Sequence, residues 1–132
     1  MTATLIKHDV DLMVEVADQV FDLSYDPEIQ TDPESKQDHL LPSELALIER
    51  FCDGLDDIGI TTAEQFMDRL SCAKESERGM TPEAVFTEET IDDYEIESWI
   101  VIDYQLTWDC NLRFDYNTVT DGKGWTYFFY NH

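Results

Sequence analysis

Basic residues are scarce in this sequence, and the scarcity limits which partners the chain can bind. The chain has eight Lys and Arg against thirty Asp and Glu, a formal net charge of −22 at pH 7. No Lys or Arg occurs between residues 79 and 112, a stretch that holds nine Asp and Glu. Binding to nucleic acid or to an anionic membrane depends on Lys and Arg, so we expect neither as a direct partner. The composition favours a basic partner, and the commonest large basic surface on a protein is a nucleic-acid-binding site.

Long apolar runs and paired cysteines are also missing. The longest apolar run, residues 99–102, is far too short to span a bilayer, and the N-terminus has no apolar signal-peptide segment. Cys52, Cys72 and Cys110 are odd in number and lack C-x-x-C spacing, which is typical of reduced thiols in or near a core. We therefore expect a cytoplasmic protein.

Motifs for catalysis are absent as well. No nucleophile elbow, zinc-binding or phosphate-binding motif occurs, and Gly122 and Gly124 belong to a turn. His8, His39 and His132 are isolated, which favours surface positions over ligands or bases. Asp103, Asp109 and Asp115 resemble a divalent-ion set, but thirty acids always supply some such triplet. We predict no enzyme activity, no catalytic residue, no metal site and no cofactor.

Apolar residues, by contrast, are plentiful. Hydrophobic residues make up 42 % of the chain and aromatic residues 12 %, whereas disordered acidic chains are poor in aromatics. All three tryptophans lie in residues 86–132, so we expect an aromatic core beneath an acidic surface there. A charge of about 2–8 suffices for a small soluble domain, so the excess indicates either a functional use or adaptation to high salt.

The first predicted helix, residues 9–23, has an acidic face with no basic residue. Asp9 is its predicted N-cap. The inward face is Val10, Met13, Val14, Ala17, Val20 and Phe21. The outward face carries Asp11, Glu15, Asp18 and Asp22. Like charges at this spacing destabilise a helix by about 0.2–0.5 kcal/mol per pair, and solvated faces usually mix signs. The row is therefore a candidate binding surface.

A second helix is predicted over residues 41–55, after a linker at 25–37 with two Asp-Pro pairs. Its inward face is Leu45, Ile48, Phe51, Cys52 and Leu55. Asp53, Asp56 and Asp57 crowd its C-terminal end, where the helix dipole disfavours carboxylates. A local rule broken in this way is typical of a functional surface.

Capping signals predict further helices. Thr62 and Gln65 have capping-box spacing at the start of a third helix. Its apolar stripe is Ala63, Phe66, Met67, Leu70 and Ala73. Glu64 and Asp68 lie on its outer face. Thr81 followed by Pro82 predicts the start of a short helix or turn.

The C-terminal segment predicts a β-hairpin. Residues 116–120 and 125–131 flank the turn 121–124, and both faces of the second strand are aromatic. Residues 106–117 alternate apolar and polar, which favours a strand. A helix beginning after Asp103, with Tyr104, Trp108 and Leu112 on one face, fits the same residues.

Residues 60–132 resemble the C-terminal part of ArdA-type antirestriction proteins. In that family an acidic loop leads to an I-D-Y/W element and a helix, then to a D-Y pair and an aromatic hairpin. The matching residues are Ile102-Asp103-Tyr104, Asp115-Tyr116, Asp121-Gly122 and 127–131, with Phe66 and Phe86-Thr87-Glu88-Glu89 upstream. The chain departs from the family in being short, with one of three α+β units missing or reduced, and residues before 60 do not align.

The resemblance implies a DNA mimic, usually a dimer, that occupies the DNA groove of type I restriction–modification enzymes. It also implies a helix over 106–112. We predict an α+β protein of about three helices on a small antiparallel sheet that includes the hairpin. We expect a single domain, with a possible division into 1–40 and 41–132.

We predict that the function is inhibition of a basic DNA-binding defence enzyme, with a homodimer as one arrangement. The alternatives are a module for another basic partner (a CRISPR effector, a histone-like protein or a polymerase) and a halophile-adapted domain. The predicted contact carboxylates are Asp11, Glu15, Asp18, Asp22, Asp53, Asp56, Asp57, Glu64, Asp68, Glu88, Glu89, Asp92, Asp93, Glu95, Glu97, Asp103, Asp109 and Asp115.

Overall fold

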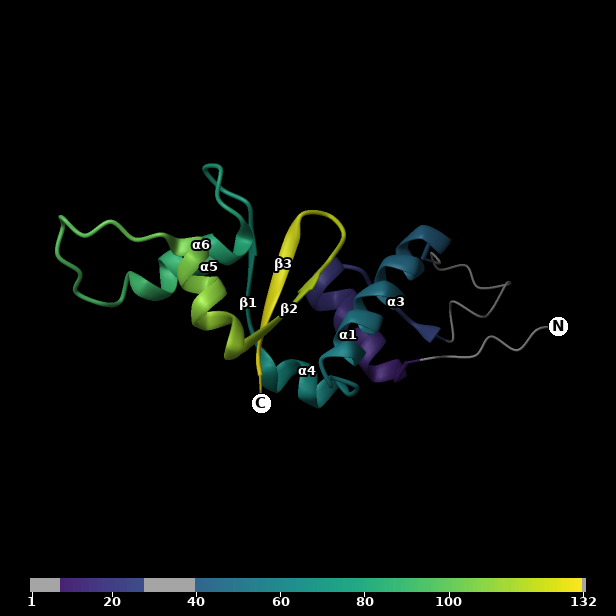
Figure 1. Ribbon diagram of the computed structural model, residues 1–132. Coiled ribbons are helices and arrows are strands. Elements are labelled where there is room, and N and C mark those ends of the chain that lie inside the picture. Colours follow the sequence, from purple (N-terminus) through teal and green to yellow (C-terminus); the bar gives the residue numbers. More distant parts are fainter. Residues whose placement is uncertain (1–7, 28–39, 132) are drawn as a thin grey trace. The chain divides into compact units, whose positions relative to one another are not determined.

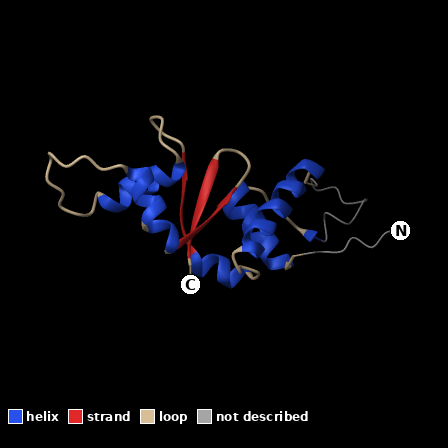
Figure 2. Cartoon of the chain, viewed as in Figure 1, coloured by secondary structure: helices blue, strands red, loops and turns tan. Residues whose placement is uncertain are grey.

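The fold belongs to the α+β class, as predicted. The computed structural model describes residues 8–27 and 40–131. Over these residues the order is α1 (Val10–Phe21), α3 (Pro42–Asp57), α4 (Ala63–Arg69), β1 (Leu70–Glu75), α5 (Pro82–Ile91), α6 (Tyr104–Cys110), the 3₁₀ helix η1 (Leu112–Phe114), β2 (Tyr116–Thr120) and β3 (Trp125–Tyr130). Figure 1 and Figure 2 show these helices and the sheet.

The chain divides into two compact units, residues 1–68 and residues 69–132, here called unit 1 and unit 2. From the sequence we expected one domain, with any division near residue 40. The division lies later because the second helix packs on the first, with the Phe21 and Phe51 ring centroids 6.1 Å apart. Residues 28–37 of the predicted linker lie outside the described residues.

Helix α1 begins where its capping signal predicts. The Leu12 amide donates to Asp9 Oδ1 at 3.1 Å, which satisfies one of the unpaired donors of the first turn. The buried face is Leu12, Met13, Val16 and Ala17. The buried face is therefore rotated about the helix axis from the predicted one. Apolar residues lie almost all around this helix, so the helical period alone does not determine which of them face the core. Val10, Val14, Val20 and Phe21 are only half-buried.

Helix α3 buries the face that the sequence predicts. Ile48, Phe51, Cys52 and Leu55 are all at most 1 % exposed, and Leu45 is half-buried. The helix starts at Pro42, and the Leu41 amide donates to the Glu44 carboxylate at 2.7 Å. Ile60 and Phe66 are also fully buried in unit 1.

The third predicted helix starts correctly but was predicted too long. The Gln65 amide donates to Thr62 Oγ1 at 3.2 Å, and Gln65 Oε1 accepts from the Thr61 amide at 2.8 Å. The helix ends at Arg69, and Leu70–Glu75 form strand β1 instead. Antiparallel pairing of β1 with β3 supplies backbone hydrogen bonds from a distant segment, and such pairing overrides local helix propensity.

The sheet has three antiparallel strands in the order β1-β3-β2, so β3 lies in the centre. The predicted hairpin is confirmed, with Thr118 opposite Phe128. Asp121 is 6 % exposed and accepts hydrogen bonds from the amides of Lys123 (2.6 Å) and Trp125 (3.1 Å), which fixes the turn. Phe128 and Phe129 point to opposite faces because they are consecutive in a strand. Both are fully buried, so the prediction of packing on both faces is confirmed.

Residues 104–110 form a helix, which confirms the helix that the resemblance implies and rules out the strand that period-two alternation alone favours. The Leu106 amide donates to Asp103 Oδ1 at 3.0 Å, and a capped start of this kind outweighs the alternation. Trp108 is buried, whereas Leu106 is 56 % exposed. The strand pattern holds only from Tyr116 onward.

An aromatic cluster joins α5 and α6 to one face of the sheet. Phe86 stacks on Phe128 with ring centroids 4.3 Å apart, and Trp108 meets Phe128 edge-on at 5.4 Å. Tyr116 packs edge-on against Phe86 at 4.9 Å. The Thr81 hydroxyl accepts from the Ala84 amide at the start of α5, as predicted. These rings hold both helices in fixed positions on the sheet.

Candidate functional site

The acidic row on α1 is exposed and almost free of internal partners. Asp11, Asp18 and Asp22 are exposed and Glu15 is half-buried. The only hydrogen bond to this row within the described residues comes from the Gln19 amide group to Asp18. The last turn of α1 contains no basic residue. The carboxylates therefore repel one another with little internal compensation, which is a cost to the fold.

Asp22 combines two unfavourable features. It caps the C-terminus of α1 with φ 54° and ψ 42°, in the left-handed region. Asp tolerates this region better than most residues, but glycine is the residue that adopts it without strain. Its carboxylate also lies at the negative end of the helix dipole. Its carboxylate has no hydrogen bond or ion pair with another described residue of unit 1.

The carboxylates at the end of α3 form a second acidic group, of which Asp53 has a partner within the chain. Asp56 and Asp57 are exposed, and the last turn has no Lys or Arg. Asp53 is bound by His8 Nε2 at 2.7 Å across 45 residues. The His8 side chain is 7 % exposed, so the prediction that it is an isolated surface residue was wrong. His39 and His132 lie outside the described residues.

The remaining carboxylates of unit 1, Glu64 and Asp68 on α4, are exposed as predicted. Neither carboxylate makes a hydrogen bond or ion pair to another residue within 8–27 and 40–131. Arg50 is the only Lys or Arg among the described residues of unit 1. The described surface of this unit therefore carries many carboxylates and a single basic side chain.

On α5 the predicted contact carboxylates are already paired inside the molecule. Arg78 binds Glu88 at 2.6 Å, and Lys74 of β1 binds Glu89. The hydrogen bond that Lys74 donates to Glu89 raises the pKa of Lys74, and the bond that Arg78 donates to Glu88 raises the pKa of Arg78. The ion pairs of Glu88 and Glu89 were not predicted from the sequence. Glu88 and Glu89 are thereby less available to an outside partner than the α1 row.

The carboxylates around α6 differ in their roles. Asp103 caps the helix, and Asp109 accepts from the Gln105 amide group at 3.2 Å. Asp115 is exposed and follows η1; burial raises the pKa of Tyr116, and the charge of Asp115 contributes to this rise. These three predicted residues are spread along unit 2. Within the described residues no group of three or more His, Cys, Asp and Glu is placed to hold a metal ion.

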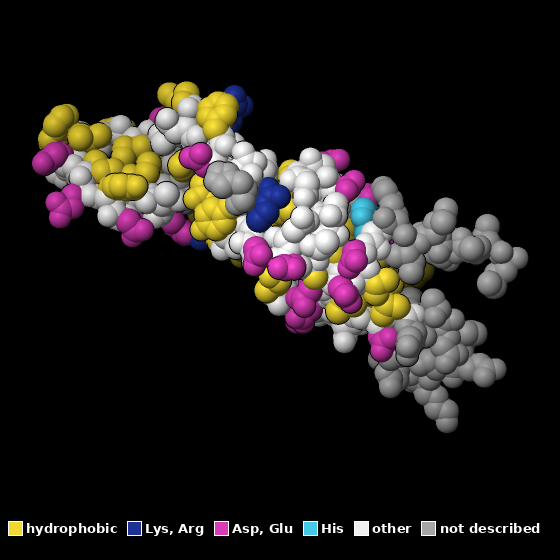
Figure 3. All heavy atoms as spheres, turned by 90° about the horizontal axis from the view of Figure 1, so that it is seen from below, with side chains coloured by type: hydrophobic (Ala, Val, Ile, Leu, Met, Phe, Trp, Pro, Cys, Tyr) yellow, Lys and Arg dark blue, Asp and Glu magenta, His cyan; other side chains and the backbone are white. Residues whose placement is uncertain are grey.

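The loop between α5 and α6, residues 92–103, carries an acidic cluster of its own. Asp92, Asp93, Glu95 and Glu97 are all exposed, and their carboxylates make no hydrogen bond or ion pair to any other residue that the structure describes. Figure 1 shows this loop extending away from both helices. Unexpectedly, it also exposes large apolar side chains, and Trp99 is 79 % exposed. The prediction that the aromatics of 86–132 form a core was wrong for this tryptophan and for Tyr94, Phe114, Trp125 and Tyr130, which are also exposed. Apolar and acidic side chains both gather at the left of Figure 3, where the loop lies.

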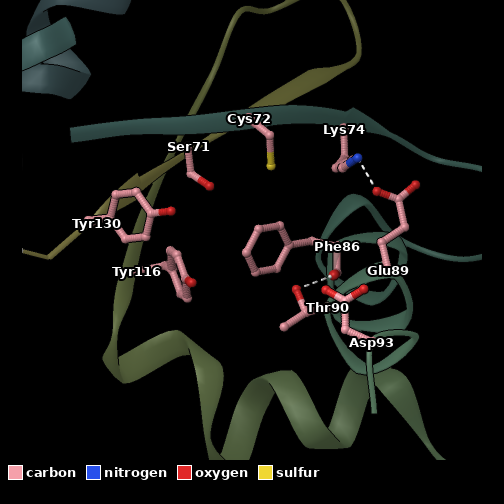
Figure 4. A pocket seen from close by; sticks show the side chains of 9 residues that line it. All are labelled: Ser71, Cys72, Lys74, Phe86, Glu89, Thr90, Asp93, Tyr116 and Tyr130. Atoms are coloured by element: carbon pink, nitrogen blue, oxygen red, sulfur yellow. Dashed lines mark hydrogen bonds and ion pairs between the residues drawn. The ribbon is translucent and has the colours of Figure 1, made fainter. Parts of the chain in front are cut away.

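A hollow of about 350 Å³ lies beside the aromatic cluster in unit 2. In Figure 4 the side chains of Cys72, Tyr116 and Tyr130 point into it, and the Lys74–Glu89 pair borders it. Burial raises the pKa of the Cys72 thiol and of the Tyr116 hydroxyl, so both groups are held in their neutral, protonated forms. A protonated thiol is a poor nucleophile, so Cys72 is not activated in this position.

The three cysteines are free thiols in different surroundings. Cys52 is fully buried, and burial together with Asp53 and Glu49 raises its pKa to about 12. Cys72 is half-buried, in line with a position near the core. Cys110 is exposed, so the core or near-core position predicted for it was wrong. It lies at the end of α6, on the side away from Trp108.

Comparison with known proteins adds no relative. No protein-family model matches the chain, and neither the curated proteins nor the solved structures contain a significant match. None of the helices within the described residues is long and apolar enough to cross a membrane.

Proposed function

We propose that this protein inhibits a DNA-binding enzyme by presenting carboxylates in place of DNA phosphates, with a type I restriction–modification enzyme as the target. The observation that carries the proposal is the α1 row, whose exposed carboxylates lie on a regular helix and lack a basic partner among the described residues. A helix with an outward row of this kind loses stability through repulsion, and a basic partner would reverse that loss.

The spacing of the row suits this role. Asp11 and Asp22 are eleven residues apart, so the row spans about 16 Å at a rise of about 1.5 Å per residue. One strand of duplex DNA has a phosphate every ~3.4 Å along the axis, or about five over that length. Four carboxylates on α1 approach this density. The carboxylates near the end of α3 add negative charge within the same unit.

Burial of the opposite face keeps the row in place. Leu12, Val16 and Ala17 are at most 1 % exposed and anchor α1 in the unit 1 core. Carboxylates on an anchored helix do not have to be ordered on binding, which spares the entropy that a flexible acidic tail would lose. Long-range attraction to a basic cleft should also make association fast at low salt.

The test is displacement of a labelled DNA duplex from a purified type I restriction–modification enzyme, followed by fluorescence anisotropy. The intact chain should displace the duplex at low salt, and less effectively as salt increases. Failure to displace it at low salt would contradict the proposal. Displacement from a CRISPR effector, a histone-like protein or a polymerase instead would favour the broader class of acidic interaction module.

A matched pair of variants tests the role of α1. The triple variant Asp11→Asn/Asp18→Asn/Asp22→Asn should weaken displacement about tenfold, taking ~0.5 kcal/mol for each exposed charge contact. The control Glu75→Gln/Glu77→Gln/Glu83→Gln removes the same number of charges from unit 2 and should weaken it less than about threefold. Equal losses would mean that net charge, and not the α1 row, determines binding.

Thermal unfolding with and without molar salt distinguishes the proposed function from the alternative of a halophile-adapted domain. A DNA mimic should remain folded at low salt, because its partner and not the solvent compensates its charge. A chain that unfolds at low salt and folds in molar salt would show that the acidity is an adaptation to the medium.

A further inference from the structure

The loop between α5 and α6 exposes an unusual concentration of large apolar side chains. Val101 is 95 % exposed, Trp99 79 %, Tyr94 69 %, Ile100 43 % and Ile96 39 %. Single exposed apolar residues are ordinary on protein surfaces. Five within eight consecutive residues concentrate exposed apolar surface in one loop, and exposed apolar patches mark interaction sites. Tryptophan and tyrosine are also enriched among the residues that contribute most to binding at interfaces.

Both ends of the loop are held in place. Its start continues from α5, where the Tyr94 amide donates to Ile91 O at 2.8 Å. Within it, the Ile100 amide donates to Glu97 O at 3.0 Å. Its end is Asp103, which caps α6. The two flanking helices meet in the aromatic cluster through Phe86 and Trp108. The exposed apolar residues therefore lie on a loop whose two flanking helices are packed in the core of unit 2.

The charges beside the patch restrict what can cover it. Asp92, Asp93, Glu95 and Glu97 precede or alternate with the apolar residues along the loop, and residues 79–112 contain no Lys or Arg. Covering the patch with the same loop of a second copy would bring eight carboxylates together, which like-charge repulsion opposes. An anionic membrane is opposed for the same reason. The complementary occupant is a protein surface with an apolar recess bordered by Lys and Arg.

We propose that this loop is an apolar anchor, in which Trp99 and Val101 enter an apolar recess of the DNA-binding target while the four carboxylates meet basic residues at its rim. The proposal rests on the proposed function and adds a contact that phosphate mimicry alone lacks. Proteins that handle unpaired bases provide such recesses, since they stack bases on apolar and aromatic side chains beside Lys and Arg that hold the phosphates. The exposed Trp99 indole has the flat aromatic face that such a recess takes, so it occupies the place of a base.

The test measures binding of the fluorescently labelled chain to the purified type I enzyme at low and at high salt. Trp99→Ala/Val101→Ala should lose about 30-fold in affinity at both salt concentrations, as expected for an interface hot spot of ~2 kcal/mol. Apolar contacts are not screened by salt, so the factor should stay constant. Asp92→Asn/Asp93→Asn/Glu95→Gln/Glu97→Gln should lose affinity at low salt and much less at high salt.

Leu106→Ala is the matched control, because Leu106 is an exposed apolar residue of the same unit outside the loop. It should change affinity less than about threefold. Far-UV circular dichroism should show the same fold for all variants, since the substituted side chains are exposed.

The outcomes separate the anchor from the proposed function. If Trp99→Ala/Val101→Ala binds like Leu106→Ala while the intact chain displaces DNA, the anchor is wrong and the proposed function stands. If the intact chain does not bind the enzyme, both are wrong. If the substitutions instead convert a free dimer to a monomer in sedimentation, the loop is a self-association surface and the anchor is overturned.

Discussion

Unit 1 and unit 2 each contain thirteen described Asp and Glu residues, but they differ in basic residues. Unit 1 has one described Lys or Arg and unit 2 has five. In unit 2 two of the five form ion pairs with α5, and Arg69 donates to the Tyr130 carbonyl at 2.7 Å. Acidic residues of equal number are therefore partly compensated in one unit and nearly uncompensated in the other.

The two cores differ as well. Unit 1 is a helical unit whose core is mostly aliphatic, with Phe51 and Phe66 at its largest positions. Unit 2 has a sheet and a cluster of stacked and edge-on rings around Phe128. The row of unpaired carboxylates on α1 and the exposed apolar loop therefore belong to different units. The charge row depends on a helix packed by aliphatic contacts, and the loop depends on an aromatic cluster.

Truncation of the aromatic core should have the largest effect and should affect unit 2 first. Phe128 is fully buried and contacts Phe86 and Trp108. Phe128→Ala should lower the free energy of unfolding by about 3–5 kcal/mol. All three tryptophans lie in unit 2, so tryptophan fluorescence in urea reports this unit, whereas far-UV circular dichroism reports both. Coincident loss of the two signals would show that the two units unfold together, which would contradict the prediction that unit 2 is affected first.

Alkaline pH should weaken unit 1 through Cys52. Its folded-state pKa of about 12 lies above the ordinary value of 9.0, so the folded thiol keeps its proton where the unfolded thiol loses it. The stabilisation is full below pH 9 and is lost as pH rises from 9 towards 12. Urea unfolding by far-UV circular dichroism between pH 8 and 11 should show this decline. Cys52→Ala should be less stable at pH 8 but show a shallower decline, and an unchanged slope would argue against Cys52 as its source.

Breaking the Lys74–Glu89 pair tests whether unit 2 uses its acids for internal contacts. Glu89→Gln should destabilise unit 2 by about 0.5 kcal/mol, the usual range for an exposed ion pair, because Lys74 loses its charged partner. The measurement is urea unfolding by tryptophan fluorescence at low salt, and the difference should shrink at high salt. Displacement of DNA should hardly change. A large loss of displacement would place α5 among the partner contacts after all.

Removal of the charge at Asp22 should have the smallest effect on stability, with the opposite sign. Asp22→Asn keeps a residue that tolerates the left-handed region and removes a carboxylate from the negative end of α1. Stability should rise by about 0.3–0.5 kcal/mol, measured by far-UV circular dichroism in urea, while displacement of DNA weakens slightly. A variant that is less stable would show that the carboxylate supports the fold.

Local signals were predictable from the sequence. The caps at Asp9, Thr81 and Asp103 each accept from an amide three residues later, so the whole interaction lies within a window of four residues. The hairpin turn is equally local. Strand β1 was not predictable, because its residues suit a helix and its partner β3 begins fifty residues further along the chain. The contact that determines its conformation is absent from any local window.

The candidate site also has parts that could be predicted from the sequence and parts that could not. The α1 row follows from helical period alone and could be predicted. The pairing of Glu88 and Glu89 could not, because Arg78 and Lys74 reach them across a turn and from a strand that the sequence did not indicate. The exposure of Trp99 was missed because tryptophan is usually buried. The signal that existed was the alternation of Tyr94, Glu95, Ile96 and Glu97 between two helices, with no strand available to pair with it.

The position of β3 has a consequence for the order in which the molecule forms during synthesis. β3 is the central strand of the sheet and the last of its strands to leave the ribosome. Until it emerges, β1 lacks its partner, and Phe86 and Trp108 lack the ring on which they pack. Every described buried residue of unit 1 precedes residue 69, so its contacts are available earlier. Domains generally fold in the order in which they are made. The acidic helices should therefore be in place while the nascent unit 2 still awaits its final strand.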